Sequence, residues 1–134
     1  MEPVVVYLED DPYSREVLEM VICGEMGITN LTIFEDSTDF IERVTVLDPQ
    51  PNVFFLDIHV KPHSGFEVLD MLRHDPEFSG AVVVALTASV MNEEVQRLKT
   101  AGFNGVIAKP IDLDTFQDTF ARLLEGEKIW RIVG

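Results

Sequence analysis

Carboxylic acids stand at two places in the chain, each directly after a short apolar run. Glu9, Asp10 and Asp11 follow one run, and Asp57 follows another. Carboxylates that lie close together repel one another unless a cation compensates. A hard divalent ion suits such oxygen ligands, and Mg²⁺ usually takes one or two carboxylates together with water and phosphate oxygens. These acids are therefore candidate metal ligands, although acids after a strand can also simply cap the next helix.

A hydroxyl and an ammonium group follow two further apolar runs. Thr87 follows the run 81–86, and Lys109 follows the run 106–108. A threonine hydroxyl can hydrogen-bond a phosphoryl oxygen, and a lysine ammonium can neutralise one. Either residue alone is compatible with an ordinary strand end. Together with the acids, they predict one pocket for a phosphoryl group and a metal ion.

Five apolar runs alternate with segments of helical periodicity, and a last helical segment follows the fifth run. The runs predict strands at 4–8, 31–34, 53–56, 81–86 and 106–108. Expected helix boundaries are Asp11 with Pro12, Ser64 with Gly65, Gly102, and Asp112 as the last cap.

Strict alternation of strands and helices predicts a doubly wound α/β fold with a parallel sheet and right-handed crossovers. In such sheets, binding sites form at the carboxyl ends of the strands. The acids, Thr87 and Lys109 all stand at expected strand ends. The predicted elements therefore bring the candidate chemistry to one edge of the sheet.

Composition excludes several classes of function. The length of 134 residues fits one domain, and the net charge of −14 argues against nucleic-acid binding and against attraction to anionic membranes. No apolar run approaches the ~20 residues of a membrane span, and the N-terminus lacks the pattern of a signal peptide. The single cysteine, Cys23, cannot form an internal disulfide. We expect a cytoplasmic protein.

Four stretches together resemble the receiver domain of two-component response regulators: YLEDDPYSR (7–15), FFLDIHVKPHSGFEVL (54–69), VVVALTA (82–88) and GFNGVIAKPID (102–112). The resemblance implies a flavodoxin-like receiver domain over residues 1–125, with a five-stranded parallel sheet in the order 2-1-3-4-5 and five flanking helices. Residues 126–134 would be a short C-terminal tail.

The resemblance also implies partners. Receiver domains take a phosphoryl group from a sensor histidine kinase or a histidine phosphotransfer protein and then bind a downstream protein. With no effector domain in the sequence, we expect a stand-alone regulator that is a monomer or a weak homodimer. Its only catalytic activities would be self-phosphorylation and self-dephosphorylation.

The family's site residues carry over to matching positions. Asp57 corresponds to the phosphoacceptor and to one metal ligand. Asp10 would bind Mg²⁺ or Mn²⁺ directly, Glu9 would bind it through water, and the backbone carbonyl of His59 would complete the site.

The acidic pair is assigned from its distance to a basic residue. Arg15 stands five residues after Asp10, which is the usual spacing from the second acid of the family's pair. Asp11 would then mainly cap the following helix. The alternative pair, Asp10 with Asp11, stays open.

Other family roles fall on the later strand ends. Thr87 and Lys109 would stabilise the phosphoryl group, and the bond before Pro110 is expected to be cis. His59 and Ser89 each stand two residues beyond a pocket residue, where they would modulate the lifetime of the phosphorylated state unless they are ordinary exposed loop residues.

Two positions depart from the family pattern. Lys61 replaces a usual proline, with Pro62 one position late, and Val106 replaces a usual aromatic residue. The loop over the site is therefore expected to follow a different path, and a ring flip at position 106 is excluded.

Three other classes of protein compete with this interpretation. A magnesium-dependent phosphatase of the haloacid-dehalogenase type also uses a nucleophilic aspartate, but it needs a second aspartate where this chain has His59. A flavodoxin-like electron carrier needs a hydroxyl-rich loop where this chain has three acids. A degenerate receiver that acts only as a scaffold is disfavoured by the intact pocket.

Overall fold

The fold is built on one parallel sheet. The computed structural model describes residues 2–88 and 91–131. The strands are β1 (Val5–Leu8), β2 (Leu31–Phe34), β3 (Val53–Asp57), β4 (Val82–Thr87), β5 (Gly105–Ala108) and β6 (Ile129–Arg131). Their order is β2-β1-β3-β4-β5-β6, and each neighbouring pair is parallel. The predicted fold class and the order 2-1-3-4-5 are confirmed.

The sixth strand lies in the segment expected to be a tail. Strand β6 pairs with β5, so that Gly105 is opposite Ile129 and Val106 is opposite Trp130. A strand of three residues is too short to show a periodic pattern in the sequence. Residues 129–131 thus belong to the sheet of the domain.

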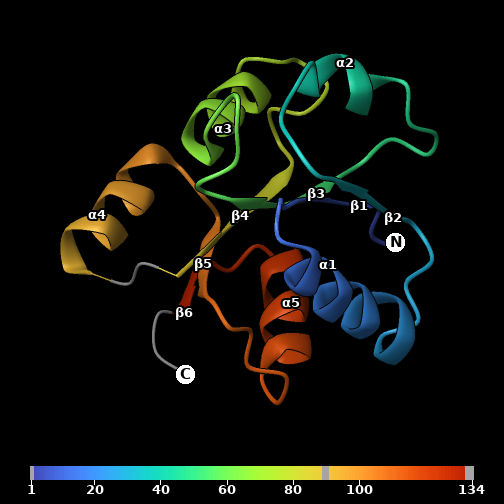
Figure 1. Ribbon diagram of the computed structural model, residues 1–134, viewed down its shortest axis with the longest axis vertical. Helices are drawn as coiled ribbons and strands as arrows, with labels where there is room; N and C mark the ends of the chain where they lie inside the picture. Colours follow the sequence, from blue (N-terminus) through green and yellow to red (C-terminus); the bar gives the residue numbers. More distant parts are fainter. Residues whose placement is uncertain (1, 89–90, 132–134) are drawn as a thin grey trace.

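Helices cover both faces of the sheet. They are α1 (Pro12–Glu19), which continues into the π-helical segment η1 (Met20–Glu25), then α2 (Phe40–Thr45), α3 (Gly65–Arg73), α4 (Asn92–Ala101) and α5 (Phe116–Leu124). Helices α1 and α5 lie on one side of the sheet, and α2, α3 and α4 lie on the other (Figure 1). Within residues 2–88 and 91–131, none of these helices has the length and apolar character needed to cross a membrane.

Local capping sets the start of two helices near the site. Asp11 accepts a hydrogen bond from the backbone N–H of Ser14 at 2.9 Å, and Pro12 takes the first position of α1, as predicted. Ser64 and Glu67 form a reciprocal capping box at the start of α3. Short-range hydrogen bonds therefore determine where both chain segments leave the site.

The predicted cap of the last helix is wrong. Helix α5 begins at Phe116, preceded by Thr115, rather than after Asp112. The carbonyl of Asp112 accepts hydrogen bonds from the backbone N–H groups of Thr115 and Phe116, and its carboxylate accepts one from Asp114. Asp112 therefore closes a turn that precedes the helix.

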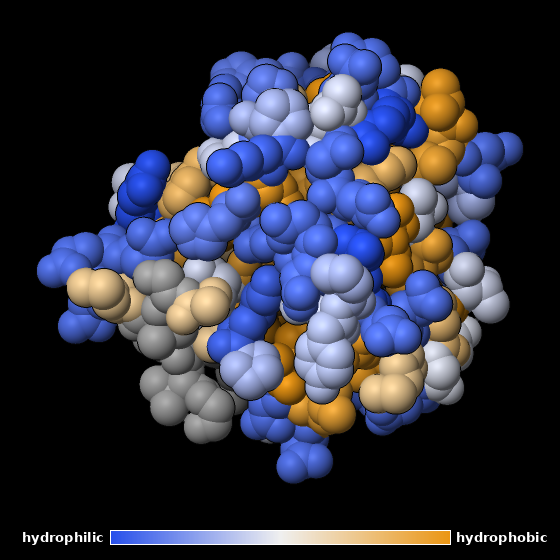
Figure 2. Space-filling model, in the orientation of Figure 1, coloured by the Kyte–Doolittle hydropathy of each residue, from blue (hydrophilic) through white to orange (hydrophobic). Residues whose placement is uncertain are grey.

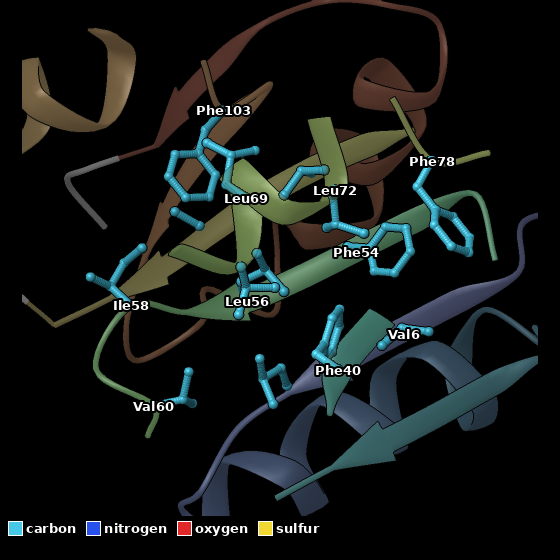
Figure 3. Close-up of a cluster of buried hydrophobic side chains, with 14 of the residues drawn as sticks. Val6, Phe40, Phe54, Leu56, Ile58, Val60, Leu69, Leu72, Phe78 and Phe103 are labelled. Atoms are coloured by element: carbon cyan, nitrogen blue, oxygen red, sulfur yellow. The ribbon is translucent and has the colours of Figure 1, made fainter. Parts of the chain in front are cut away.

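The core is divided by the sheet into two apolar clusters. Val6 and Phe54 face the side of α2, α3 and α4 (Figure 3), and Leu8 belongs to the same cluster, whereas Val5 and Tyr7 face α1 and α5. This alternation follows from the two-residue period of a strand. Full burial of each such side chain contributes roughly 1.5–3 kcal/mol, so β1 is anchored on both faces and holds the residues that follow it in place.

The outer surface is dominated by polar side chains. Hydrophilic residues cover most of the face seen in Figure 2, and apolar residues show between them. This distribution agrees with the net charge of −14.

Candidate functional site

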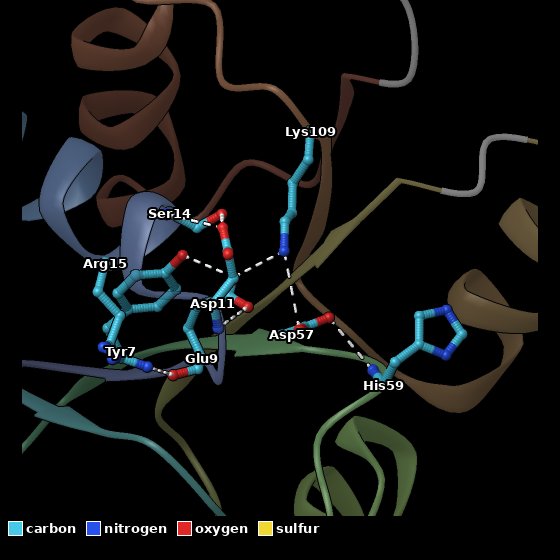
Figure 4. Close-up of polar contacts among 8 residues, drawn as sticks. All are labelled: Tyr7, Glu9, Asp11, Ser14, Arg15, Asp57, His59 and Lys109. Carbon is cyan, nitrogen blue, oxygen red and sulfur yellow. Dashed lines mark hydrogen bonds and ion pairs between the residues drawn. The ribbon is translucent and has the colours of Figure 1, made fainter.

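Four predicted site residues meet where β1, β3, β4 and β5 end. Asp57 and Thr87 are the last residues of β3 and β4, and Glu9 and Lys109 directly follow β1 and β5. The Nζ atom of Lys109 lies 2.7 Å from Oε1 of Glu9 and 3.7 Å from Oδ2 of Asp57 (Figure 4). The strand ends thus bring acidic and basic groups from distant parts of the chain into contact.

Three acids form a cluster at this point. Glu9, Asp10 and Asp57 each offer a carboxylate oxygen, and these oxygens all lie within 4.8 Å of one another. Glu9 is 0% exposed and Asp57 is 5% exposed, whereas Asp10 is exposed. A compact set of oxygen ligands with an open side fits a hard divalent cation such as Mg²⁺ or Mn²⁺.

The electrostatics of the cluster also fit a cation. Burial raises the pKa of Glu9, and the nearby carboxyl of Asp57 raises it further, while hydrogen bonds from Lys109 and Tyr7 oppose the shift. The ammonium group of Lys109 lies within 4 Å of the carboxylates of Glu9 and Asp57, and Asp10 adds a third carboxylate to the cluster. The negative charge that remains can be neutralised by a divalent ion.

Asp57 is held in a defined orientation. Its Oδ1 accepts a hydrogen bond from the backbone N–H of His59 at 3.2 Å, and its Oδ2 faces Lys109. Helix α3 begins close beneath this position, because a Cβ on Gly65 would lie 2.9 Å from the Cα of Ile58 and 3.0 Å from the carbonyl oxygen of Asp57. A buried, oriented carboxylate beside a cation can act as a nucleophile.

The other predicted site residues differ in their burial. Thr87 is fully buried at the end of β4, and its carbonyl accepts a hydrogen bond from the backbone N–H of Lys109 at 2.9 Å. The bond before Pro110 is cis, as predicted. The side chain of His59 is exposed, and its ring extends away from Asp57 (Figure 4). Ser89 lies outside the described residues.

Asp11 is engaged by helix α1. Its Oδ2 accepts hydrogen bonds from both the hydroxyl and the backbone N–H of Ser14, which hold the pKa of the Asp11 carboxyl below its ordinary value. The guanidinium of Arg15 donates to the backbone carbonyl of Glu9 at 3.0 Å. These contacts favour Glu9 with Asp10 as the acidic pair, and Asp11 as the helix cap.

The loop after Asp57 is held in place by a buried serine that no sequence pattern marks as a site residue. Ser37 is buried, its N–H donates to the carbonyl of Lys61, and its hydroxyl exchanges hydrogen bonds with the backbone of His63 at 2.7 and 2.8 Å. The side chain of Lys61 is exposed, and the bond to Pro62 is cis. Ser37 belongs to a loop far away in sequence, so no local pattern signals this contact.

Tyr7 was not among the predicted site residues, although its position in the sequence indicates a contact with Glu9. It is the only residue with a polar side-chain atom in the apolar run before Glu9, and it stands two residues from that acid. Residues two apart on a strand share a face. The hydroxyl of Tyr7 donates a hydrogen bond to Oε1 of Glu9 at 2.9 Å.

Comparison with known proteins agrees with this geometry. The family model of the response regulator receiver domain matches residues 5–121. This chain belongs to that family. It is therefore a receiver domain of the type found in two-component signalling.

Curated relatives of this receiver domain are matched over only part of their own length. The chain is 29% identical over 126 residues to a nitrate/nitrite response regulator protein homolog of Haemophilus influenzae, with 93% of this chain and 58% of that protein covered. It is 32% identical over 75 residues to the polar-differentiation response regulator DivK of Brucella anthropi, with 56% and 61% covered. The matched regions thus make up less than two thirds of either relative.

Solved structures share the fold of the receiver domain. The chemotaxis response regulator CheY4 of Vibrio cholerae superposes with a TM-score of 0.79 at 18% identity, and the match covers 92% of this chain and 99% of that one. At this identity, the likeness supports the arrangement of strands and helices and says nothing further about the site.

Proposed function

We propose that this receiver domain accepts a phosphoryl group on Asp57 from a phosphohistidine of a sensor kinase or a histidine phosphotransfer protein. The phosphorylated form then signals by binding a downstream protein. The observation that carries the proposal is the buried carboxylate of Asp57, with its Oδ2 3.7 Å from Nζ of Lys109 and two further acids beside it.

In the proposed reaction, a carboxylate oxygen of Asp57 attacks the phosphorus atom. The P–O bond forms as the P–N bond to the imidazole breaks, and the electron pair leaves with the nitrogen. Little covalent assistance is needed, because catalysis of such transfers is mainly positioning and charge neutralisation. Lys109 and the hydroxyl of Thr87 would hold the phosphoryl oxygens, and the 3.7 Å between Nζ of Lys109 and Oδ2 of Asp57 supports this role for the lysine.

The acid cluster is the proposed metal site. Asp10 and Asp57 would bind Mg²⁺ or Mn²⁺ directly, Glu9 through water, and His59 through its backbone carbonyl. When bound, the ion neutralises charge on the phosphoryl oxygens. His59 and Ser89 would affect how readily water reaches the acyl phosphate.

Other properties follow from the same proposal. The protein would catalyse only its own phosphorylation and dephosphorylation, and it would act as a monomer or weak homodimer without binding nucleic acid. The acidic surface supports the last point. A cytoplasmic location is supported by the exposed free thiol of Cys23, which fits a reducing compartment.

The test is phosphorylation of a single position. Purified protein given Mg²⁺ and a small phosphodonor should gain one phosphoryl group by intact-protein mass spectrometry. Asp57→Asn should gain none, because an amide is not a nucleophile at neutral pH, whereas the exposed control Asp70→Asn should be labelled like the wild type. Unchanged labelling of Asp57→Asn would show that another residue is the acceptor. Steady turnover of a generic phosphomonoester would instead support the phosphatase.

A further inference from the structure

A buried tyrosine hydroxyl shares one oxygen of Glu9 with the site lysine. Tyr7 is 0% exposed, and its hydroxyl lies 2.9 Å from Oε1 of Glu9. Nζ of Lys109 lies 2.7 Å from the same oxygen. The other oxygen of Glu9 accepts a hydrogen bond from the backbone N–H of Asp11 at 3.3 Å. The buried carboxylate is therefore held by a phenol, an ammonium group and a backbone amide.

Lys109 is engaged with Glu9 more closely than with Asp57. Its Nζ lies 2.7 Å from Glu9 and 3.7 Å from Asp57. To donate to a phosphoryl oxygen on Asp57, we expect the ammonium to turn from Glu9 toward Asp57. A buried carboxylate that loses its partners is strongly destabilised. Tyr7 donates to the same oxygen, so it would still hold the Glu9 carboxylate after such a turn.

The surroundings leave room for such a movement. Tyr7 and Lys109 both line a cavity of about 290 Å³, which Val17, Ala88 and Pro110 also border. The lysine stem therefore has open space on one side, whereas Tyr7 is fixed in strand β1 and packs in the core facing α1 and α5.

We propose that Tyr7 is a positioning residue for phosphoryl transfer, which keeps the Glu9 carboxylate hydrogen-bonded and in place while Lys109 turns toward the phosphoryl group on Asp57. This inference rests on the proposed function. Tyr7 does not contact the reacting atoms, and it acts through Glu9.

The direct test is Tyr7→Phe, which removes the hydroxyl and keeps the ring. With saturating Mg²⁺ and acetyl phosphate, the rate constant of phosphorylation should fall about tenfold, the size expected for the loss of one hydrogen bond to a charged group. The control is Thr45→Val, which removes an exposed hydroxyl from helix α2, outside the site, and should keep the wild-type rate. An unchanged rate in folded Tyr7→Phe would overturn this inference and leave the proposed function standing. A wild type that gains no phosphoryl group would overturn the proposed function and this inference with it.

A double-mutant comparison separates positioning from general weakening of the fold. In a Glu9→Ala background, Tyr7→Phe should slow phosphorylation by less than twofold, because the acceptor of the Tyr7 hydroxyl has been removed. If the tenfold loss persisted without the Glu9 carboxylate, Tyr7 would act by another route and the inference would be wrong.

A spectroscopic measurement needs no substitution. Protein labelled with ¹³C at the tyrosine ζ carbon gives signals from the two tyrosines, Tyr7 and Tyr13. The Tyr7 signal should shift on phosphorylation, since its hydrogen bond to Glu9 strengthens once Lys109 moves. A phosphorylated protein with an unshifted Tyr7 signal would contradict the inference.

Discussion

Adjacent aspartates Asp10 and Asp11 differ in what their carboxylates contact. Asp10 lies in the cluster with Glu9 and Asp57, whereas Asp11 accepts both hydrogen bonds of Ser14 at the start of α1. We expect Asp10→Ala to weaken Mg²⁺ binding at least about tenfold, because a direct ligand is lost. Asp11→Ala should leave the affinity nearly unchanged and lower only the stability of the fold. Calorimetric titration measures both affinities, and the reverse ranking would mean that Asp10 and Asp11 form the acidic pair.

Strand β6 packs closely against β5 at Gly105, where there is no room for a side chain. A Cβ on Gly105 would lie 2.7 Å from the carbonyl oxygen of Ile129 and 2.9 Å from a methyl group of Leu123. We expect Gly105→Ala to lower the free energy of unfolding by about 1–3 kcal/mol, because neither strand β6 nor helix α5 can move without losing contacts. Urea unfolding measures this change, and the fluorescence of Trp130, the only tryptophan, reports on β6 directly.

A matched glycine provides the control for this substitution. A Cβ on Gly80 would meet no atom within 4 Å. Gly80→Ala should therefore change the free energy of unfolding by no more than about 0.5 kcal/mol. Equal effects at Gly105 and Gly80 would indicate that β6 does not pack against β5 in solution.

Signal output depends on how the site is connected to the rest of the molecule. The backbone of Thr87 is hydrogen-bonded to that of Lys109, and β5 continues from Lys109 toward Val106. Val106 is fully buried, with Ala85 and Trp130 opposite it on the neighbouring strands. A branched, enclosed side chain has little rotamer freedom, so a ring-type flip at this position is excluded.

We therefore expect phosphorylation to change the backbone around residues 87–91 and the adjoining face of α4, β5 and α5, where β6 covers the edge of β5. Hydrogen exchange followed by mass spectrometry, with and without a beryllofluoride phosphoryl mimic and Mg²⁺, should show altered exchange in peptides that span 87–91. The Asp57→Asn protein should show no such change under the same conditions. Altered exchange confined to another surface would place the output elsewhere.

Much of the fold was accessible from local patterns. Continuous apolar runs predicted five of the strands, since a strand buried on both faces needs apolar residues throughout. Asp11 and Ser64 marked helix starts because a cap acts on atoms only two or three residues away. The meeting of Asp57 and Lys109 also followed, because parallel strands end at the same edge of a sheet.

What the sequence alone determined is thus the set of elements, the order in which chemical groups reach the strand ends, and the family. Only the tertiary structure decided which of these groups touch. It pairs Lys109 most closely with Glu9, adds the hydroxyl of Tyr7 to the same oxygen, and joins β6 to β5. No helix or strand periodicity and no capping pattern predicts the contacts of Lys109 and β6. They depend on the three-dimensional packing that brings distant segments within hydrogen-bonding distance.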